Sequence, residues 1–334
     1  MGVFLNYEIL YPDLLFDIVN FFSETVNKNG QTEYKDVMSF CNYYHKLNPD
    51  KEFIQPSIIS TICDILCENR RLSSIQRSGF DNVKGTYYCI LSQDVKENLQ
   101  LRHTLNKQLS YLVYGFKYIY EDYKQCVLPV EYTDNKGDIS LGTCFLYDGG
   151  IATAKHCVEG ASAIAIQGIP KEKLREAKFE IHQNSMMDLL FIRTEENISN
   201  SLWFNEDAEI LDEVMTMGYP IISGFHNFLT AENATVAARF TASTGQIVSN
   251  AEDIFIQEKL FLITAKIKGG NSGGPVIKKN GYIVGISSRL EKAEGNYDDL
   301  GYGTVIPISF LNELLFSKDK YYLNVNKIKF KDFE

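Results

Sequence analysis

The sequence lacks the features that mark membrane proteins and nucleic-acid-binding proteins. Over its 334 residues, no apolar run reaches the roughly 18 residues that a membrane-spanning helix requires. It has no basic tract either, since 33 Lys and Arg stand against 43 Asp and Glu and give a formal net charge of −10 at pH 7. Proteins bind phosphate groups through clustered positive charge. We therefore expect neither a membrane nor a nucleic acid among its partners.

The chain has 7 cysteines, an odd number, so they cannot all pair in disulfides within one chain. Cys63 and Cys67 lie four residues apart on a predicted helix, but no second pair and no histidine follows at the spacing of metal ligands. We interpret both as small apolar core residues and expect neither a metal nor an organic cofactor. The first residues show no basic region and no cleavage-like site of a secretory signal. These absences predict a cytoplasmic protein.

Two short motifs point to nucleophilic catalysis. Residues 153–157 read Thr-Ala-Lys-His-Cys, and residues 269–275 read Gly-Gly-Asn-Ser-Gly-Gly-Pro. A serine hydroxyl is a poor nucleophile at neutral pH, so it needs an imidazole to accept its proton. Ser272 and His156 suit these two roles. The surrounding glycines allow unusual backbone angles, which lets the Gly270 and Ser272 amides point together at a developing oxyanion.

The two motifs resemble the histidine and serine boxes of the trypsin-like, chymotrypsin-fold serine proteases. The HtrA/Deg-type branch is the most similar, because its serine box has the sequence Gly-Asn-Ser-Gly-Gly-Pro, whereas secreted trypsins usually have Asp in place of Asn. Further segments extend the resemblance over about residues 127–316, namely 217–220, 245–249, 281–288 and 301–308. The resemblance implies a double six-stranded β-barrel, here without the PDZ domain that usually follows it in this branch.

The family places the third catalytic residue, an aspartate, between the histidine and the serine, at the start of an apolar strand. Residues 187–192 read Met-Asp-Leu-Leu-Phe-Ile and match that pattern at Asp188, whereas other acids in the interval lack the apolar continuation. A carboxylate at the mouth of a buried strand needs a partner, and the Nδ1–H of His156 supplies one. The resemblance therefore implies a triad of His156, Asp188 and Ser272. In the alternative interpretation, Asp188 is an ordinary aspartate at the end of a surface strand.

The resemblance also implies a set of substrate-binding residues. They are Lys266, Ser288, Arg289, Leu290, Gly301 and Gly303. Ser288 corresponds to the family residue near the triad aspartate, and the segment from Ser288 should pair with the substrate backbone as an added strand. Lys266 stands six residues before the nucleophile, at the floor of the primary pocket. A cation there favours an acidic residue before the scissile bond, unless Lys266 points to solvent.

One departure from the secreted members concerns a disulfide. Those proteins bridge the cysteine that follows the catalytic histidine, here Cys157, to a cysteine on the preceding strand. The corresponding position is Leu141, and Cys144 lies three residues away, on a strand whose alternation predicts another direction. We therefore expect no disulfide at Cys157, which is consistent with a reducing compartment.

The first 91 residues do not resemble a protease. Helical spacing of apolar residues marks three stretches, 13–26, 34–47 and the segment from Pro56. Two short stretches rich in β-formers then predict a hairpin, 72–75 and 86–91. Helices followed by a hairpin suggest a winged-helix-like domain, a fold that often binds DNA. Because this part holds 8 Lys and Arg against 11 Asp and Glu, we favour a protein-interaction or sensor domain.

The fold class expected from these observations is multidomain α+β. Residues 1–91 form the α-rich, winged-helix-like domain, and residues 92–126 form one long amphipathic connecting helix. Residues 127–318 form the chymotrypsin-type double barrel, and residues 319–334 form a C-terminal tail.

The expected function is that of a serine endopeptidase that cleaves protein or peptide substrates through an acyl-enzyme. We expect an activating protein partner to act through residues 1–125, in a bacterial stress, signalling or defence setting that is inferred by analogy. The alternative is a catalytically idle protein that uses the protease fold as a binding scaffold.

Overall fold

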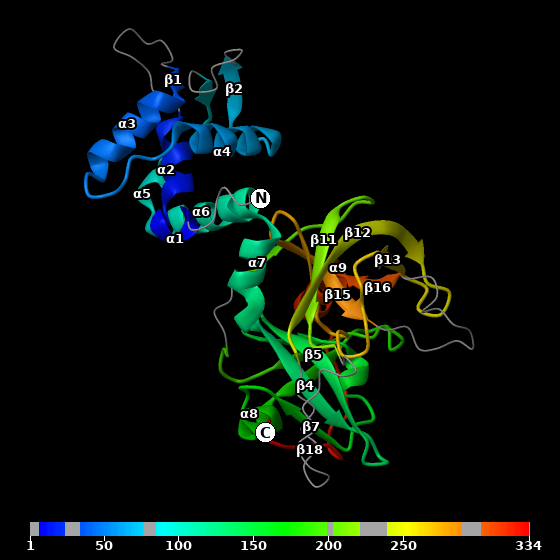
Figure 1. The fold of residues 1–334 in the computed structure, drawn as a ribbon. Helices are drawn as coiled ribbons and strands as arrows, with labels where there is room; N and C mark the ends of the chain where they lie inside the picture. Colours follow the sequence, from blue (N-terminus) through cyan, green and yellow to red (C-terminus); the bar gives the residue numbers. More distant parts are fainter. Residues whose placement is uncertain are drawn as a thin grey trace. The chain divides into compact units, whose positions relative to one another are not determined.

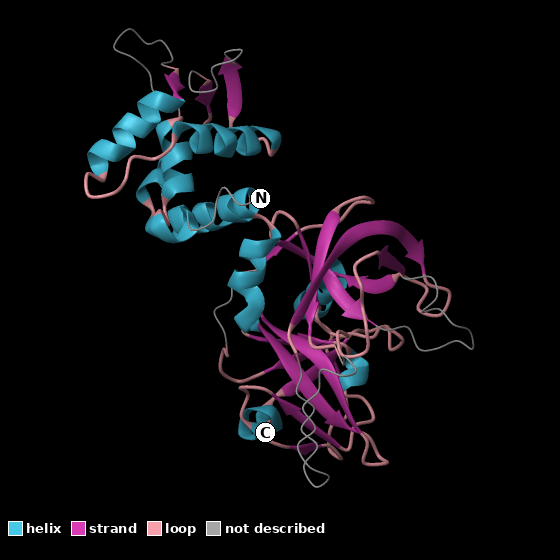
Figure 2. Cartoon of the chain, viewed as in Figure 1, coloured by secondary structure: helices cyan, strands magenta, loops and turns pink. Residues whose placement is uncertain are grey.

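The structure is a computed structural model. It describes residues 7–23, 34–76, 85–198, 203–220, 239–288 and 302–333. The chain divides into two compact units, Met1–Ile119 and Tyr120–Glu334 (Figure 1). The first unit is mainly helical, and the second consists mainly of strands (Figure 2). The helical N-terminal region followed by a β-barrel region confirms the expected α+β class.

The first unit begins with helices that share one apolar core. They are α1 (Tyr7–Leu10), α2 (Leu14–Phe21), α3 (Val37–Leu47) and α4 (Pro56–Glu68). Local signals determine where the two longer helices, α3 and α4, begin. The Asp36 side chain accepts a hydrogen bond from Ser39 N at the start of α3, and Pro56 occupies the first turn of α4. Leu14, Phe40 and Ile59 are fully buried in the shared core.

A small antiparallel sheet completes this part of the unit. Its strands, in the order β1-β3-β2, are β1 (Lys35–Asp36), β2 (Ser73–Gln76) and β3 (Thr86–Tyr88). The predicted hairpin corresponds to β2 and β3, and its loop lies outside the described residues. Strand β1 was not predicted, because two residues directly before a helix carry no period-2 pattern.

The connecting segment differs from the single long helix that its apolar spacing predicts. It forms three helices, α5 (Gln93–Glu97), α6 (Leu99–Tyr114) and α7 (Phe116–Tyr123). Asn98 separates the first two, since its side chain caps α6 by accepting hydrogen bonds from the N–H groups of Gln100 and Leu101. Gly115 ends α6 at φ 64° and ψ −154°, a conformation that is almost restricted to glycine. The spacing detected the amphipathic face but not these two breaks.

The first barrel occupies the N-terminal half of the second unit. Its strands are β4 (Val127–Thr133), β5 (Ile139–Tyr147), β6 (Gly150–Thr153), β7 (Ala163–Ile166), β8 (Lys178–Ile181) and β9 (Leu190–Arg193). They pair in the order β8-β9-β6-β5-β4-β7. Short helical segments connect or precede them: η2 (Lys124–Cys126), η3 (Lys155–Cys157) and α8 (Lys171–Glu176). Fully buried Val130, Ile151 and Ile192 belong to its core.

The C-terminal tail completes this barrel. Strand β17 (Tyr321–Tyr322) pairs with β8, and strand β18 (Lys329–Phe330) pairs in parallel with β7. Within the described part of the sheet, β7 and β8 do not pair with each other, so the tail covers both edges of a six-stranded sheet. Phe330 inserts into the core, where its ring centroid lies 5.7 Å from that of Phe179.

The second barrel is closed. Its strands are β11 (Glu213–Gly218), β12 (Thr241–Glu252), β13 (Lys259–Ile263), β14 (Pro275–Lys278), β15 (Tyr282–Ser288) and β16 (Gly303–Pro307). They pair in the order β15-β14-β11-β12-β13-β16, and β16 returns to β15. Strand β10 (Phe204–Asn205) adds in parallel to β15, and α9 (Ile308–Phe316) follows β16. The two sheets together form a chymotrypsin-like double barrel. Among the described residues, none of the helices combines the length and apolar character needed to cross a bilayer.

Candidate active site

His156 lies on η3, directly after β6, where Asp188 contacts it twice. One carboxylate oxygen of Asp188 accepts a hydrogen bond from His156 N at 2.9 Å, and the other lies 2.7 Å from Nδ1 of the ring. A carboxylate in this position accepts, so Nδ1 carries the proton, and Nε2 is the acceptor of the neutral ring. The two contacts fix both the backbone of His156 and the orientation of its ring.

Asp188 stands two residues before β9, and a third donor reaches it from the second barrel. Ser288 Oγ, at the end of β15, donates to Asp188 Oδ2 at 2.6 Å. The carboxylate side chain is 18% exposed, and its three hydrogen bonds offset the cost of withdrawing it from water. The structure therefore brings three predicted residues, His156, Asp188 and Ser288, into one hydrogen-bonded group.

The environment of His156 favours its protonated form. Burial alone would lower the pKa of His156, but the hydrogen bond to Asp188, the adjacent Cys157 sulfur and the Asp188 charge outweigh it. The result is a pKa above the 6.5 of a free imidazole. A base of this kind takes a proton readily and holds it while a charged intermediate exists.

Ser272 lies in a turn that is tied to both barrels. On the first-barrel side, Thr143 of β5 donates its N–H to Ser272 O at 2.9 Å and its hydroxyl to Gly270 O at 2.6 Å. On the second-barrel side, Gly273 N donates to Ser287 O at 2.7 Å. Gly273 has a φ of 88°, and a Cβ there would lie 2.1 Å from Thr143 O, so only glycine fits. The Ser272 residue itself is 3% exposed.

Two amides of this turn differ from their neighbours. The N–H groups of Asn271, Gly273 and Gly274 donate to backbone carbonyls at 2.7–3.0 Å. Among the described residues, the N–H groups of Gly270 and Ser272 donate no backbone hydrogen bond. Gly270 has a φ of 100°, a backbone conformation that glycine adopts without strain. The two amides expected to hold an oxyanion thus donate to no backbone carbonyl among the described residues, which is also true of the Gly269 amide before them.

The histidine segment and the serine turn are neighbours in space. Cys157, which follows His156, places its sulfur 3.8 Å from Ser272 O. In the described part of the chain, the Ser272 hydroxyl makes no hydrogen bond to the His156 ring. Such bonds are often long before substrate binds. Thr143 was missed by the sequence analysis, because its contact with Gly270 spans 127 positions along the chain and follows no local pattern.

The segment expected to line the specificity pocket includes an apolar residue that the motifs did not predict. Lys266 is exposed, and its backbone N–H binds Ser243 Oγ at 3.0 Å. The next residue, Ile267, lies against Gly303, where an added Cβ would lie 2.6 Å from Ile267 Cδ1. An aliphatic side chain therefore fills the space beside Gly303. The remaining nominated residues lie outside the described residues: Arg289, Leu290 and Gly301.

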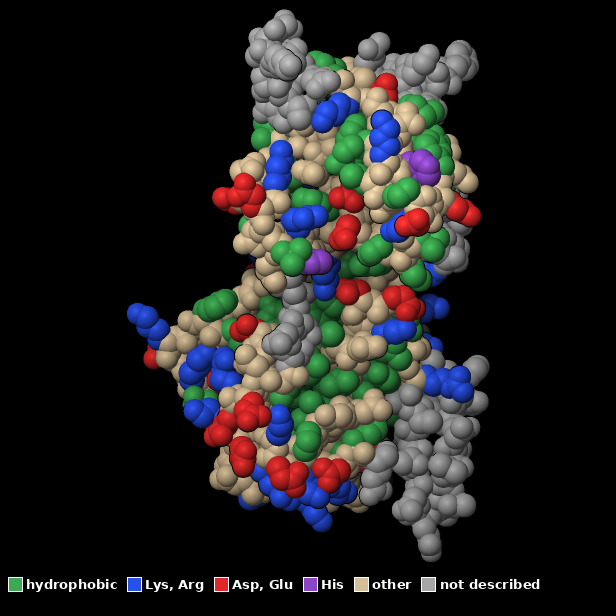
Figure 3. All heavy atoms as spheres, turned by 90° about the vertical axis from the view of Figure 1, so that its left-hand side faces the viewer, with side chains coloured by type: hydrophobic (Ala, Val, Ile, Leu, Met, Phe, Trp, Pro, Cys, Tyr) green, Lys and Arg blue, Asp and Glu red, His purple; other side chains and the backbone are tan. Residues whose placement is uncertain are grey.

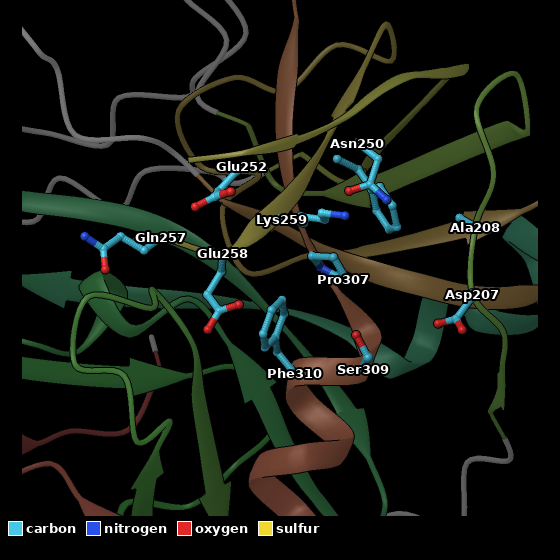
Figure 4. A pocket seen from close by; sticks show the side chains of 11 residues that line it. Asp207, Ala208, Asn250, Glu252, Gln257, Glu258, Lys259, Pro307, Ser309 and Phe310 are labelled. Atoms are coloured by element: carbon cyan, nitrogen blue, oxygen red, sulfur yellow. The ribbon is translucent and has the colours of Figure 1, made fainter. Parts of the chain in front are cut away.

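A separate cavity of about 530 Å³ lies between the β12–β13 hairpin and the start of α9 (Figure 4). In Figure 4, Glu258 and Phe310 lie on opposite elements beside Pro307. The lining contains none of the three triad candidates, so this cavity is not the site described above. Within the described ranges, no group of three or more His, Cys, Asp and Glu side chains is arranged to hold a metal ion.

The double barrel and the arrangement around His156 define a class, that of the chymotrypsin-fold serine proteases. Comparison with known families agrees, because residues 142–286 match the model of the trypsin-like peptidase domain. Residues 142–286 are therefore similar to the trypsin-like peptidases, and the DegP relatives below support the HtrA-type resemblance that the motifs predicted. This match supports a serine endopeptidase.

Curated relatives support the same assignment. A probable periplasmic serine endoprotease, DegP-like, from Hahella chejuensis is 27% identical over 172 residues, which are 51% of this chain and 33% of that protein. The periplasmic serine endoprotease DegP of Escherichia coli K12 is 25% identical over 180 residues, 53% of this chain and 35% of DegP. The chain thus spans about a third of the length of these relatives. Their activity does not favour the idle-scaffold alternative.

Among solved structures, the active form of the Rv3671c protease from M. tuberculosis is similar, with a TM-score of 0.46 and 20% identity. The match covers 63% of this chain and 88% of that one. The fold assignment rests on the strand pairing described above and not on this likeness.

The prediction of a cytoplasmic protein was wrong. The curated relatives are named periplasmic serine endoproteases, which points to the periplasm. An unpaired Cys157 does not require a reducing compartment, because an oxidising compartment permits disulfides but does not require them. Cys157 is free and fully buried, with its sulfur 2.4 Å from where a Cβ on Gly142 would lie. Its unpaired state therefore identifies no compartment.

Proposed function

We propose that this chain is an endopeptidase that cleaves proteins or peptides through an acyl-enzyme. Ser272 attacks the scissile carbonyl, and His156 takes the hydroxyl proton and later gives it to the leaving amine. Asp188 holds the His156 ring with its Nδ1 protonated and stabilises the imidazolium. The amides of Gly270 and Ser272 stabilise the oxyanion of the tetrahedral intermediate.

The observation that carries this proposal is the double contact of Asp188 with His156. A surface aspartate at the end of a strand has no need of a 2.9 Å bond to the backbone and a 2.7 Å contact to the ring of the same histidine. A general base needs both, because the tautomer and the direction of Nε2 must be set before substrate arrives. The amides of Gly270 and Ser272 support the same role for the turn, because among the described residues they donate to no backbone carbonyl.

The substrate preference in the proposal follows from Ile267. An aliphatic side chain beside Gly303 shortens the pocket and favours a small apolar residue before the scissile bond. Lys266 is exposed, which gives less support to the acidic preference predicted from its position. A library of peptides that differ only before the scissile bond separates the two, since cleavage after Glu but not after Val or Ala would favour Lys266.

We also propose that the N-terminal unit regulates the protease by binding a protein in a bacterial stress, signalling or defence response. On the face in Figure 3, the Lys and Arg side chains of this unit, in the upper part, are interspersed with Asp and Glu. That mixture does not suit a nucleic-acid partner. Leu47, which ends α3, and Phe53 are 61% and 44% exposed, as at protein-binding surfaces. Because its named relatives are periplasmic, we place this activity in the periplasm.

Replacing the nucleophile tests the proposed chemistry. Ser272→Ala should lower hydrolysis of an unfolded protein such as casein by on the order of 10⁶-fold, because no other group forms the acyl-enzyme. The matched control is Ser309→Ala, an exposed serine at the start of α9, which should retain full activity. Equal hydrolysis by the wild type and Ser272→Ala would reject the proposal.

A further inference from the structure

The turn that leads into Asp188 is held from two directions by side chains outside the triad. This turn, residues 184–187, is called the aspartate turn below. Lys155 reaches it from η3 of the first barrel, and Asn184 ties it to the β12–β13 hairpin of the second barrel. The proposed mechanism gives neither side chain a role, so it does not explain why both contact the aspartate turn.

Lys155 is a buried lysine directly before the candidate base. Its side chain is 10% exposed, and Nζ donates to Ser185 O at 2.5 Å and lies 3.4 Å from Glu159. Its own N–H donates to Asp188 O at 3.3 Å. Burying an ammonium costs free energy unless oxygen atoms replace its water. One half-exposed carboxylate and one carbonyl offset only part of the cost of burying the ammonium, so these contacts add little to stability. They do fix the aspartate turn beside η3.

Asn184 organises the same turn and extends it to the other barrel. Its own carbonyl and side-chain oxygens accept from Met187 N at 3.0 Å and Met186 N at 3.1 Å, which shapes the turn. Its Nδ2 donates to Ile256 O at 2.9 Å, at the tip of the β12–β13 hairpin. The bond crosses 72 positions of the chain and joins the two barrels one turn before Asp188.

The hairpin tip that Asn184 contacts is held by its own hydrogen bonds. Asp253 Oδ1 accepts from Phe255 N at 2.9 Å and Ile256 N at 2.8 Å, and Ile256 is 8% exposed. The backbone of Asp253 also pairs with Glu258 and Gln257, whose side chains appear at the cavity in Figure 4. The acceptor for Asn184 therefore lies in a tightly hydrogen-bonded loop.

We propose that Lys155 and Asn184 are positioning residues that clamp the aspartate turn, so that the Asp188 carboxylate keeps its aim at His156. The inference rests on the proposed role of the triad. Its physical basis is that a catalytic group must be held within about 0.5 Å and 10–20° of its productive geometry. Main-chain contacts at Asp188 alone do not supply this, because the segment before it is a turn and not a strand.

The test uses the full chain and three variants. Lys155→Met keeps the length of the side chain but leaves Ser185 O without its donor. Asn184→Asp keeps the oxygen that accepts from Met186 N but loses the donor to Ile256 O. Lys155→Arg keeps a donor within reach of Ser185 O and serves as the conservative variant. The matched control is Lys320→Met, which removes a lysine that binds the Leu314 and Leu315 carbonyls far from the triad in sequence.

Two readouts separate positioning from a merely structural role. For Lys155→Met and Asn184→Asp, kcat should fall roughly 10-fold with KM unchanged, short of the ~100-fold loss that a full 1 Å misplacement causes. The acidic limb of the pH profile should move to lower pH, because a poorly aimed carboxylate raises the pKa of His156 less. Lys155→Arg should restore most of both values, and Lys320→Met should change neither.

The second readout does not depend on turnover. In the Ser272→Ala background, the proton between His156 Nδ1 and Asp188 is followed by NMR, and both clamp variants should shift its low-field resonance upfield or broaden it. If Lys155→Met and Asn184→Asp left both this resonance and the acidic limb of the pH profile unchanged, the inference would be overturned even in an active enzyme. An inactive wild type with altered resonances in the variants would reject the proposed function and still support the clamp. If Lys155→Met does not fold, Asn184→Asp carries the test.

Discussion

At the residue scale, Asp188 receives hydrogen bonds from three groups in two segments, the His156 backbone, the His156 ring and the Ser288 hydroxyl. The sequence located these residues because chemistry demands particular residue types in a particular order. It could not locate Thr143 or Ile267, which matter through contacts that only the folded chain creates. The triad candidates and Ser288 were therefore predictable from residue type and order, whereas Thr143 and Ile267 were not.

Asp188→Asn tests the role of the carboxylate at this scale. The amide would favour the wrong tautomer of His156, so kcat/KM should fall by about 10⁴-fold while the fold is kept. A loss of less than about 10-fold in kcat/KM, measured with a peptide substrate, would mean that Asp188 is an ordinary surface aspartate.

The pH dependence of the same variant adds a second check. His156 must be neutral to act as a base, and its pKa is raised in the native protein, so activity should rise with pH with a midpoint above 6.5. Without the Asp188 charge and its hydrogen bond, burial is left to act and the pKa of His156 falls. The residual activity of Asp188→Asn should therefore have its midpoint at lower pH. A midpoint that stays in place would contradict the assigned cause of the shift.

At the element scale, the periodicity of apolar residues predicted the helices of the first unit and the amphipathic face of the connecting segment. It missed the breaks at Asn98 and Gly115, because a cap and a positive φ are local events that leave the spacing of apolar residues intact. It also assigned no pairing partner to the C-terminal tail, residues 319–334. The tail in fact supplies one strand to each edge of the first barrel, and such pairing over a distance has no local signature.

The tail should therefore contribute to the stability of the first barrel. Phe330→Ala removes a side chain that is 9% exposed and packs on Phe179, so it should cost roughly 3 kcal/mol of unfolding free energy. Tyr322→Ala, on the other tail strand and 52% exposed, is the control and should cost less than about 1 kcal/mol. Urea denaturation measures both, and equal effects would show that the tail does not complete the barrel.

At the scale of the whole molecule, the chain divides into two compact units, and the boundary falls within α7, after Ile119. The protease unit begins earlier than the first barrel strand at Val127. Tyr123 is 1% exposed, and its ring stacks on Trp203 with 4.0 Å between centroids and 2° between planes. Tyr120 contacts Phe240 in the same unit at 5.3 Å. The motifs could not place this boundary, because they begin only at the barrel.

Two fragments test both the boundary and the regulation. A fragment of residues 120–334 should fold, whereas one of residues 125–334 loses the Tyr123 stack and should melt roughly 10 °C lower. Regulation by the N-terminal unit predicts that fragment 120–334 and the full chain hydrolyse peptides at different rates. Equal rates, with and without a candidate protein partner, would argue against regulation by that unit.

The central claim is that Ser272 is a nucleophile activated by His156, and labelling with a fluorophosphonate tests it most directly. The probe reacts covalently with an activated serine and needs no knowledge of the substrate. The account predicts one label per chain, on Ser272, in the wild type or in fragment 120–334, and none in Ser272→Ala or His156→Ala. Absence of label from both the full chain and the fragment, or label that persists in Ser272→Ala, would contradict it.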